Sequence, residues 1–442
     1  MKNELIEAQI ENFKNTNLVE KKIKICDEIV ESLRQKQIII YGAGAAGKTL
    51  YDALELHDLI PYCFIDRRAK EIVKYKQVCV KTIDEIESCS RDNVVIIVSV
   101  DPQLFKEYTS EIKNKLKEKF SNYEVVSYGR DLSFILKCLN CSLKLEQGGK
   151  FDIIDCINCG AESRGCEVFD NFLKNDRTVV DRKLKNEYNQ FFGYIVGKNC
   201  TLKCKYCCEL VPYFKERGFV DKETIIKDCK KLASASNFNM YIELVGGEPF
   251  LHPDLPEVLD ELLKIQNVGY VKVFTNGTVP PNARLIKVLQ NPRIVLMWSN
   301  YMDVLPENLL HRVEETRKIL DEANIKYIFS YSQTWLDFST GFERNTKTVE
   351  QLENDFKDCH IANCHRLYKG MLYRCPHAYA AVQLNKLVVT EENSININKY
   401  DTDELSEKLY DFKNLKYTEA CKHCSLPYDA NEVPAAEQLE GV

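Results

Sequence analysis

The sequence predicts an α/β protein of several domains, and three observations support that prediction. Short apolar segments alternate with helical ones between residues 37 and 128, which is typical of a small parallel sheet covered by helices. The same alternation returns over residues 191–332 with longer connections. At 442 residues and 45% hydrophobic side chains, the chain has enough apolar material for two or three separate cores.

Charge and hydropathy exclude two classes of partner. The net charge is −6, with 60 lysines and arginines against 66 acidic residues, which argues against binding nucleic acid by neutralising phosphates. The longest apolar runs, such as residues 94–100, are far too short to span a bilayer. No targeting signal is visible, so we expect a cytoplasmic protein with neither nucleic-acid nor membrane partners. Residues 1–35 predict an amphipathic N-terminal helix.

Residues 36–130 predict a Rossmann-like nucleotide-binding domain. A buried strand over 37–41 leads into a glycine loop that fits both the GxGxxG pattern of dinucleotide folds and the GxxxxGKT pattern of P-loops. The strand over 61–65 then ends in an acid, at the position where a Rossmann unit binds a ribose hydroxyl. Such short units favour a Rossmann-like site over an NTPase. A third interpretation is that the glycines serve only the tight turn and the packing of the helix. The predicted nucleotide contacts are Gly42, Gly44, Gly47 and Asp66.

The 19 cysteines are expected to be reduced thiols, because no signal peptide is visible. Five stand alone, and the other fourteen (19 − 5) lie within residues 138–166, 200–208 and 359–424. The first group occupies a predicted bridge, residues 131–175, as two CxxC pairs that suit a structural zinc ribbon. Two alternatives stay open. One is a second iron–sulfur site that uses Cys166, and the other is that these thiols bind no metal. The two pairs are Cys138 with Cys141 and Cys156 with Cys159.

The second cysteine group is a CxxxCxxC run, formed by Cys200, Cys204 and Cys207 in one tight loop. Three thiolates on one loop leave the fourth iron of a cubane 4Fe-4S cluster free to bind something other than protein. A zinc site is the alternative for this spacing taken alone. Cys208 is expected to be a bystander, since the fourth position must stay open.

A second motif follows at the interval that one β/α unit needs. The strand over 240–245 leads into Gly246-Gly247-Glu248-Pro249, and a helix over 221–234 fits between the cysteines and that strand. A Gly-Gly turn before proline is a weak signal by itself. Its order and spacing relative to the cysteines make the pair of motifs specific.

Together these motifs resemble those of the radical S-adenosylmethionine (SAM) superfamily. The resemblance implies that the free iron chelates the amino and carboxylate groups of SAM. It further implies that Gly246 and Gly247 let backbone approach the methionine part, and that Glu248 accepts from its ammonium. Tyr206 matches the family's aromatic residue beside adenine. The other cofactor-binding residues that the resemblance implies are Pro249, Thr275, Asn276, Ser299 and Asn300.

The resemblance also implies a partial (β/α)6 barrel, predicted over residues 176–355. Functional residues are then expected at the carboxyl ends of its parallel strands. A charged helical segment over 176–190 precedes the first strand. The six expected strands cover residues 191–198, 240–245, 270–276, 293–300, 327–332 and 380–387.

The third cysteine group lies in residues 356–442. Its Cys359…Gly370…Cys375 spacing, followed by a CxxC pair, resembles the opening of SPASM and Twitch auxiliary-cluster domains. No cysteine follows that pair, so the resemblance implies one Twitch-like auxiliary 4Fe-4S cluster, with zinc as the alternative. A hairpin through Lys369 and Gly370 would place Cys364 opposite Cys375. We therefore predict ligation by Cys364, Cys375, Cys421 and Cys424, with Cys359 as the substitute.

The predicted function is that of a radical SAM enzyme, which cleaves SAM to methionine and a 5′-deoxyadenosyl radical that abstracts hydrogen from a substrate carbon. The N-terminal domain resembles sugar-nucleotide-binding modules, so we expect oxidation, epimerisation or rearrangement of a sugar, sugar nucleotide or glycan-related substrate. A peptide-modifying SPASM-type maturase and a non-catalytic iron–sulfur or zinc scaffold are the alternatives. A flavodoxin- or ferredoxin-type protein is the expected electron donor. The sequence assigns no hydrogen donor.

Overall fold

The computed structural model divides the chain into two compact units, Met1–Phe172 and Leu173–Val442, and each is described by itself. The predicted zinc pairs Cys138/Cys141 and Cys156/Cys159, and the helical segment over 176–190, lie outside the described residues. The structure describes residues 5–15, 19–86, 93–99, 106–127, 129, 131–137, 191–236, 239–331, 334–337 and 342–439.

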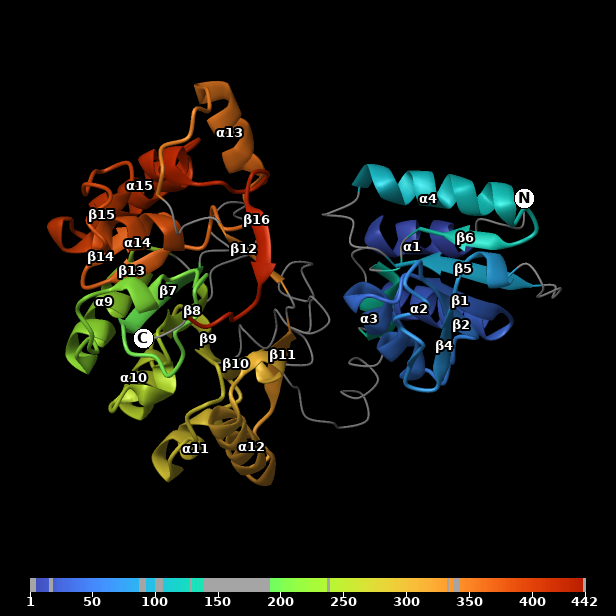
Figure 1. Cartoon of the computed structure of the whole chain (residues 1–442), viewed down its shortest axis with the longest axis horizontal. Helices are drawn as coiled ribbons and strands as arrows, with labels where there is room; N and C mark the ends of the chain where they lie inside the picture. The colour runs from blue at the N-terminus through green and yellow to red at the C-terminus, as the bar shows by residue number, and fades with distance from the viewer. Residues whose placement is uncertain are drawn as a thin grey trace. The chain divides into compact units, whose positions relative to one another are not determined.

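The first unit contains the expected parallel α/β sheet (Figure 1). All neighbouring strands pair in parallel except β3 and β4. The chain passes from β1 to β2 on one side and later returns to β5 on the other, so the strand order reverses at β1. The order across the sheet is β3 (Lys74–Tyr75), β4 (Val78–Lys81), β2 (Cys63–Ile65), β1 (Gln37–Tyr41), β5 (Val94–Val98) and β6 (Glu124–Val126).

In the described part of this unit, α-helices and one short 3-10 helix accompany the sheet. Its core is aliphatic, with Ile39 and Ile96 from the sheet packed in one cluster with Leu116. The expected single N-terminal helix is instead two, α1 and α2, so that prediction was wrong in number. The helices are α1 (Leu5–Asn15), α2 (Val19–Arg34), α3 (Ala45–Glu55) and α4 (Lys106–Lys119), with η1 at Asp84–Ile86.

The second unit is built on an eight-stranded sheet (Figure 1). Its first six strands, from β11 to β13, run parallel, as a partial barrel of six β/α strands requires. An antiparallel hairpin then extends the sheet through β14 to β15. The order is β11 (Tyr327–Tyr331), β10 (Ile294–Asn300), β9 (Val268–Thr275), β8 (Asn239–Gly246), β7 (Phe191–Gly197), β13 (Arg366–Tyr368), β14 (Met371–Tyr373) and β15 (Ser394–Asn396).

The prediction of a sixth strand over Ala380–Leu387 was wrong. The first half of that segment belongs to helix α14 (Pro376–Gln383), which begins with proline at its first position, and Cys375 Sγ accepts from the Ala378 amide. Alanines at 378, 380 and 381 favour the helix over a strand. The sixth parallel strand, which pairs with β7 on the side away from β8, is β13, and the sequence had assigned it only to a hairpin.

The remaining elements of this unit cover the sheet and its rim. Strands β12 (Thr334–Asp337) and β16 (Asn431–Pro434) form a separate antiparallel ribbon. No helix among the described residues is long and apolar enough to cross a bilayer. The helices are η2 (Val211–Tyr213), α9 (Lys222–Ser234), η3 (Pro249–Leu251), α10 (Leu255–Leu262), α11 (Ala283–Leu289), η4 (Met302–Val304), α12 (Glu307–Glu322), α13 (Val349–Asp358), η5 (Ile397–Lys399), α15 (Thr402–Lys413) and η6 (Glu419–His423).

A buried carboxylate fastens the hairpin to the rest of the unit. Asp228 on α9 accepts from the Tyr194 hydroxyl at 2.9 Å and from the Gly370 amide at 2.7 Å. The turn between β13 and β14 places Lys369 and Gly370 at positive φ, +47° and +75°, as a two-residue hairpin requires. The predicted hairpin is therefore present, and Asp228 fixes the position of its turn.

Candidate functional site

One cavity of about 520 Å³ lies at the carboxyl ends of strands β7 to β10. The loop after β7 contributes the three cysteines of the CxxxCxxC run together with Tyr206. The next three strands contribute the glycine motif and the polar residues that follow it. The predicted residues that line this cavity are Cys200, Cys204, Tyr206, Cys207, Gly246, Gly247, Glu248, Thr275, Asn276 and Ser299.

The cysteines of the loop receive hydrogen bonds at sulfur. The Leu202 amide lies 3.4 Å and the Asn276 side-chain nitrogen 3.6 Å from Cys200 Sγ, and Gln438 Nε2 lies 3.4 Å from Cys204 Sγ. Burial raises the pKa of Cys200 to about 12 and the pKa of Cys204 and Cys207 above the usual range. Bound cationic iron would therefore be needed to hold these thiols as thiolates at neutral pH.

Glu248 lies at the centre of the glycine motif and is fully buried. Its carboxylate accepts from the Phe250 amide at 3.0 Å and the Thr275 hydroxyl at 2.8 Å. The Asn276 amide donates at 2.8 Å to its other oxygen. Burial nevertheless raises the pKa of Glu248 to about 7, since these three bonds offset the lost hydration only in part. A bound cation would favour the ionised form.

The two glycines are required by the close approach of neighbouring backbone. Gly246 has φ +119°, and a Cβ at Gly247 would lie 1.9 Å from the Asn199 carbonyl oxygen. The Gly247 and Glu248 amides donate to the Gly197 and Asn199 carbonyls at 3.0 and 2.8 Å. The motif is thus pinned against the loop that carries the cysteines, which fixes Glu248 relative to them.

Pro249 and Asn300 are not among the residues that line the cavity. Pro249 is buried at the first position of η3, and the Asn300 side chain accepts from the Met302 amide at 3.1 Å. Both therefore contribute to local backbone structure in this conformation. Thr275 and Asn276 line the cavity and also hold Glu248, a positioning role that the sequence did not reveal.

The cavity lining also includes polar residues that the sequence analysis missed. Arg366 on β13 is buried, with Nε 2.6 Å from Glu209 and Nη1 3.7 Å from Glu243. Burial lowers and the two carboxylates raise the pKa of Arg366, with a net increase, so the guanidinium stays charged. Glu209 Oε2 is buried and has no hydrogen-bond partner among the described residues. The one sequence signal for this group was Glu243, which is a charged residue inside the otherwise apolar strand over 240–245.

Aromatic and thiol side chains also line the cavity. Tyr301 and Trp335 line the cavity with their rings edge to face, 5.5 Å apart. Cys208 and Cys364 also line it, and neither belongs to the CxxxCxxC run. The cavity therefore combines metal-binding groups with charged, aromatic and further thiol groups.

The third cysteine group surrounds a second, smaller cavity of about 30 Å³. Its lining includes Cys359, Cys375, Cys421 and Cys424, whereas Cys364 lines the larger cavity. We had predicted Cys364 as the fourth ligand with Cys359 as the substitute, and this placement favours Cys359. The hairpin has the predicted register, but β13 begins at Arg366, so the chain turns away before Cys364 can lie opposite Cys375.

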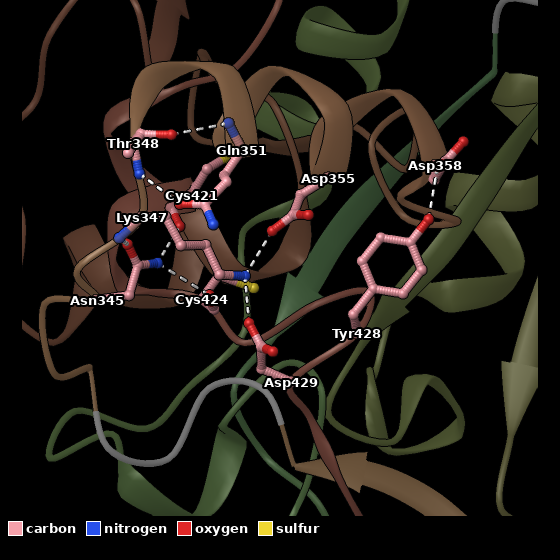
Figure 2. Close-up of polar contacts among 10 residues, drawn as sticks. All are labelled: Asn345, Lys347, Thr348, Gln351, Asp355, Asp358, Cys421, Cys424, Tyr428 and Asp429. Carbon is pink, nitrogen blue, oxygen red and sulfur yellow. Dashed lines mark hydrogen bonds and ion pairs between the residues drawn. The ribbon is translucent and has the colours of Figure 1, made fainter.

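A polar network holds the loop of the last two cysteines (Figure 2). The Asn345 side chain donates to the Cys421 carbonyl at 2.9 Å and to the Cys424 carbonyl at 3.2 Å. Lys347 pairs with Asp355 at 2.5 Å and with Asp429 at 2.7 Å (Figure 2). No three His, Cys, Asp or Glu side chains in the described part of the chain converge on a single-ion site.

In the first unit, the predicted loop residues lie together at the end of β1. Asp66 accepts from the Ala43 and Arg68 amides, both at 2.9 Å. Burial raises the pKa of Asp66, but these bonds and the Arg68 guanidinium leave it below its usual value. Gly42 has φ +104°, and a Cβ at Gly47 would lie 1.8 Å from the Gly42 carbonyl oxygen. A Cβ at Gly44 would meet only Arg68 Nη2, at 3.9 Å.

These observations define an α/β protein with a three-thiol loop and a buried carboxylate in one cavity at the end of a parallel sheet. Residues 194–336, which include all of these motifs, match the family model described as Radical SAM superfamily. This segment, residues 194–336, is therefore a radical SAM domain. A domain of this family implies a 4Fe-4S cluster and SAM. The donor set fits them, because three thiols in one loop face a cavity shared with a buried carboxylate.

Curated relatives match only part of the chain. GTP 3′,8-cyclase of Lactiplantibacillus plantarum is 25% identical over 100 residues, which cover 22% of this chain and 30% of the cyclase. Molybdenum cofactor biosynthesis protein 1 of Homo sapiens is 26% identical over 27% of this chain and 19% of its own length. 7-Carboxy-7-deazaguanine synthase of Aquifex aeolicus is 24% identical over 49% of this chain and 96% of its own. The chain thus spans less than a third of the cyclase and of the human protein.

Solved structures show weaker likeness. Native anSMEcpe with bound AdoMet is 17% identical with a TM-score of 0.37, covering 53% of this chain and 86% of its own. BtrN in complex with AdoMet and 2-DOIA is 15% identical with a TM-score of 0.33, covering 57% and 98%. The strand order and the family match therefore carry the assignment.

Proposed function

We propose that the protein is a radical SAM enzyme whose reaction takes place in the 520 Å³ cavity. The observation that carries this proposal is that Cys200, Cys204, Cys207 and Glu248 line one cavity within the matched domain. With cluster and SAM bound, the chemistry supplied is reductive cleavage of SAM and hydrogen abstraction from a substrate carbon.

The chain's own residues bind, orient and shield the reactants. Cys200, Cys204 and Cys207 would hold the cluster, and Glu248 would accept from the SAM ammonium. Thr275 and Asn276 keep the Glu248 carboxylate in place. Apolar residues such as Val245 and Phe274 are part of the lining, and they help to exclude water from a reactive radical.

The substrate is a sugar, sugar nucleotide or glycan-related molecule in this proposal. The wall formed by Glu209, Glu243 and Arg366 offers acceptors and donors for hydroxyl groups, and Trp335 offers an aromatic face. The glycine loop of the first unit, with Asp66 beside it, supports a nucleotide-linked substrate. One relative, GTP 3′,8-cyclase, is also named for a nucleotide, although the match is confined to part of each chain.

An auxiliary 4Fe-4S cluster on Cys359, Cys375, Cys421 and Cys424 is also proposed. The support is that these thiols line one cavity, and that the CxxC pair is held by Asn345 and the surrounding network. A flavodoxin- or ferredoxin-type donor would supply the electrons. Structural zinc on the 138–159 pairs remains a separate proposal.

The test is anaerobic reconstitution of the full chain with iron and sulfide, reduction, and measurement of 5′-deoxyadenosine from SAM. We expect formation by the wild type and loss of at least a hundredfold, roughly 3 kcal/mol of barrier, in Cys204→Ala. Cys79→Ala is the matched control, since Cys79 is an exposed thiol of the first unit. Equal activity in Cys204→Ala and the wild type would refute the assignment.

A further inference from the structure

Residues 431–439, which we call the strap, connect the β12–β16 ribbon to the cysteine loop. The strap begins as β16, paired with β12, whose Trp335 lines the cavity. It then forms an isolated antiparallel bridge in which Gln438 is the partner of Cys204. Two segments more than two hundred residues apart in the sequence (438 − 204 = 234) thus meet at the central cysteine.

Backbone bonds on both sides of Gln438 hold the strap against the loop. The Lys205 amide donates to the Glu437 carbonyl at 2.7 Å, and the Leu439 amide donates to the Lys203 carbonyl at 2.9 Å. Lys205 Nζ also lies 3.2 Å from the Glu437 carboxylate. The residues on either side of Cys204 are therefore paired with the residues on either side of Gln438.

The side-chain amide of Gln438 can adopt only one orientation in this setting. Its oxygen accepts from the Lys203 amide at 2.8 Å, and its nitrogen donates to the Ala436 carbonyl at 2.6 Å. In the flipped orientation, the amide nitrogen would face the Lys203 amide and the amide oxygen would face the Ala436 carbonyl. Donor would then oppose donor, and acceptor would oppose acceptor. The same nitrogen then directs an N–H toward Cys204 Sγ at 3.4 Å, which is a normal length for a bond to sulfur.

We propose that Gln438 is a positioning residue that tunes the reduction potential of the cluster held by Cys200, Cys204 and Cys207. This inference rests on the proposed function. Hydrogen bonds to cysteine sulfur withdraw electron density from the cluster and favour its reduced state, so they raise the potential. Because the amide is neutral, it achieves this without adding a charge to the cavity.

The strap also gives this bond a structural connection to the substrate side. A displacement of the paired β12–β16 ribbon would move Trp335 and Gln438 together, since both belong to that ribbon and its continuation. A substrate that contacts Trp335 would therefore affect the hydrogen bond from Gln438 to Cys204 through this hydrogen-bonded segment of the chain.

The test is a redox titration of the full-length reconstituted protein followed by electron paramagnetic resonance. The signal to follow is that of the cluster held by Cys200, Cys204 and Cys207, which is identified as the signal that the Cys204→Ala variant lacks. Gln438→Glu keeps an oxygen for the Lys203 amide but removes the donor, and Gln438→Ala removes both. We expect a more negative midpoint potential in both variants, with the larger shift in Gln438→Glu because a carboxylate also adds negative charge. Glu437→Gln, which removes only the ion pair with Lys205, is expected to keep the wild-type potential.

A second readout is iron release from the same site to a chelator, which should be faster in Gln438→Ala than in Glu437→Gln. An unchanged midpoint in Gln438→Ala would overturn the inference, as would a shift seen in Gln438→Glu alone, because charge and not the hydrogen bond would then be responsible. Neither result would touch the proposed function. That function fails instead if Cys204→Ala retains every signal of the wild type.

Discussion

The Arg366 guanidinium lies 2.6 Å from Glu209, which follows the last cysteine of the CxxxCxxC run by two residues. Both side chains are buried, at 8% and 6% exposure. This ion pair joins β13, the parallel neighbour of β7, to the end of the cysteine loop. It therefore links the cavity wall on the substrate side to the part of the loop that carries Cys207.

Removing this guanidinium should destabilise the second unit. Arg366→Met would leave the Glu209 carboxylate buried without its cation, a change that typically costs about 3–5 kcal/mol. Both tryptophans of the chain, Trp298 and Trp335, belong to the second unit, so tryptophan fluorescence during urea unfolding follows that unit alone. Arg317→Met is the control, because its pairing with Asp321 is exposed and should be worth under about 1 kcal/mol. Equal midpoints for the two variants would contradict the structural role of Arg366.

Cysteine substitutions should separate the auxiliary site from the larger cavity. Cys359→Ser removes one of the four thiols that line the small cavity, so we expect the reconstituted protein to lose roughly four iron atoms, one cubane cluster. Cys364→Ser removes a thiol of the larger cavity and should retain the full iron content. Iron and sulfide analysis measures both. Loss of iron in Cys364→Ser alone would restore the ligand set that the sequence suggested.

SAM binding should strengthen as the pH rises from 6 to 8. The pKa of Glu248 is about 7, raised from 4.5 by burial, so the carboxylate is mostly protonated at pH 6 and mostly ionised at pH 8. Only the ionised form attracts the SAM ammonium, and the ionised fraction rises roughly tenfold over that interval. Calorimetric titration of the reconstituted protein at both pH values measures the change. Glu248→Gln should bind weakly with little pH dependence, and a parallel rise in that variant would assign the titration to another group.

Two glycines of the first unit should respond differently to substitution. A Cβ at Gly44 meets only ordinary contacts, so Gly44→Val should fold while its side chain blocks the approach of a nucleotide phosphate. Gly47→Ala would force a Cβ against the Gly42 carbonyl and should destabilise the unit. Sugar-nucleotide, NAD and ATP titrations of the full chain, with circular dichroism as the folding control, test this. Unchanged nucleotide affinity in Gly44→Val would mean that the loop serves only the turn.

The sequence predicted those parts of the site that lie close together along the chain. The ligand spacing of Cys200, Cys204 and Cys207 and the Glu248 motif each occupy one loop, so chemistry is visible in the spacing itself. The pairing of Glu209 with Arg366 spans 157 residues, and nothing in either local sequence reveals the partner. The same holds for Gln438, which reaches Cys204 only through the strap.

The fold was predictable to a similar degree. Five parallel strands of the second unit were expected near their observed positions, because apolar runs bounded by turns mark them well. The sixth was misplaced, since the alanine-rich segment after Cys375 is apolar and short enough to suit a helix or a strand. The choice between Cys359 and Cys364 depended on where β13 begins, and strand ends are poorly determined by sequence.

The central claim is that SAM binds at the iron held by Cys200, Cys204 and Cys207, beside Glu248. The most direct measurement is the electron paramagnetic resonance spectrum of the reduced protein before and after SAM addition. We predict that SAM changes the signal that is missing from Cys204→Ala, and that the remaining signal keeps its shape in every variant. A spectrum that SAM leaves unchanged in the wild type, or changes equally in Cys204→Ala, would contradict the account.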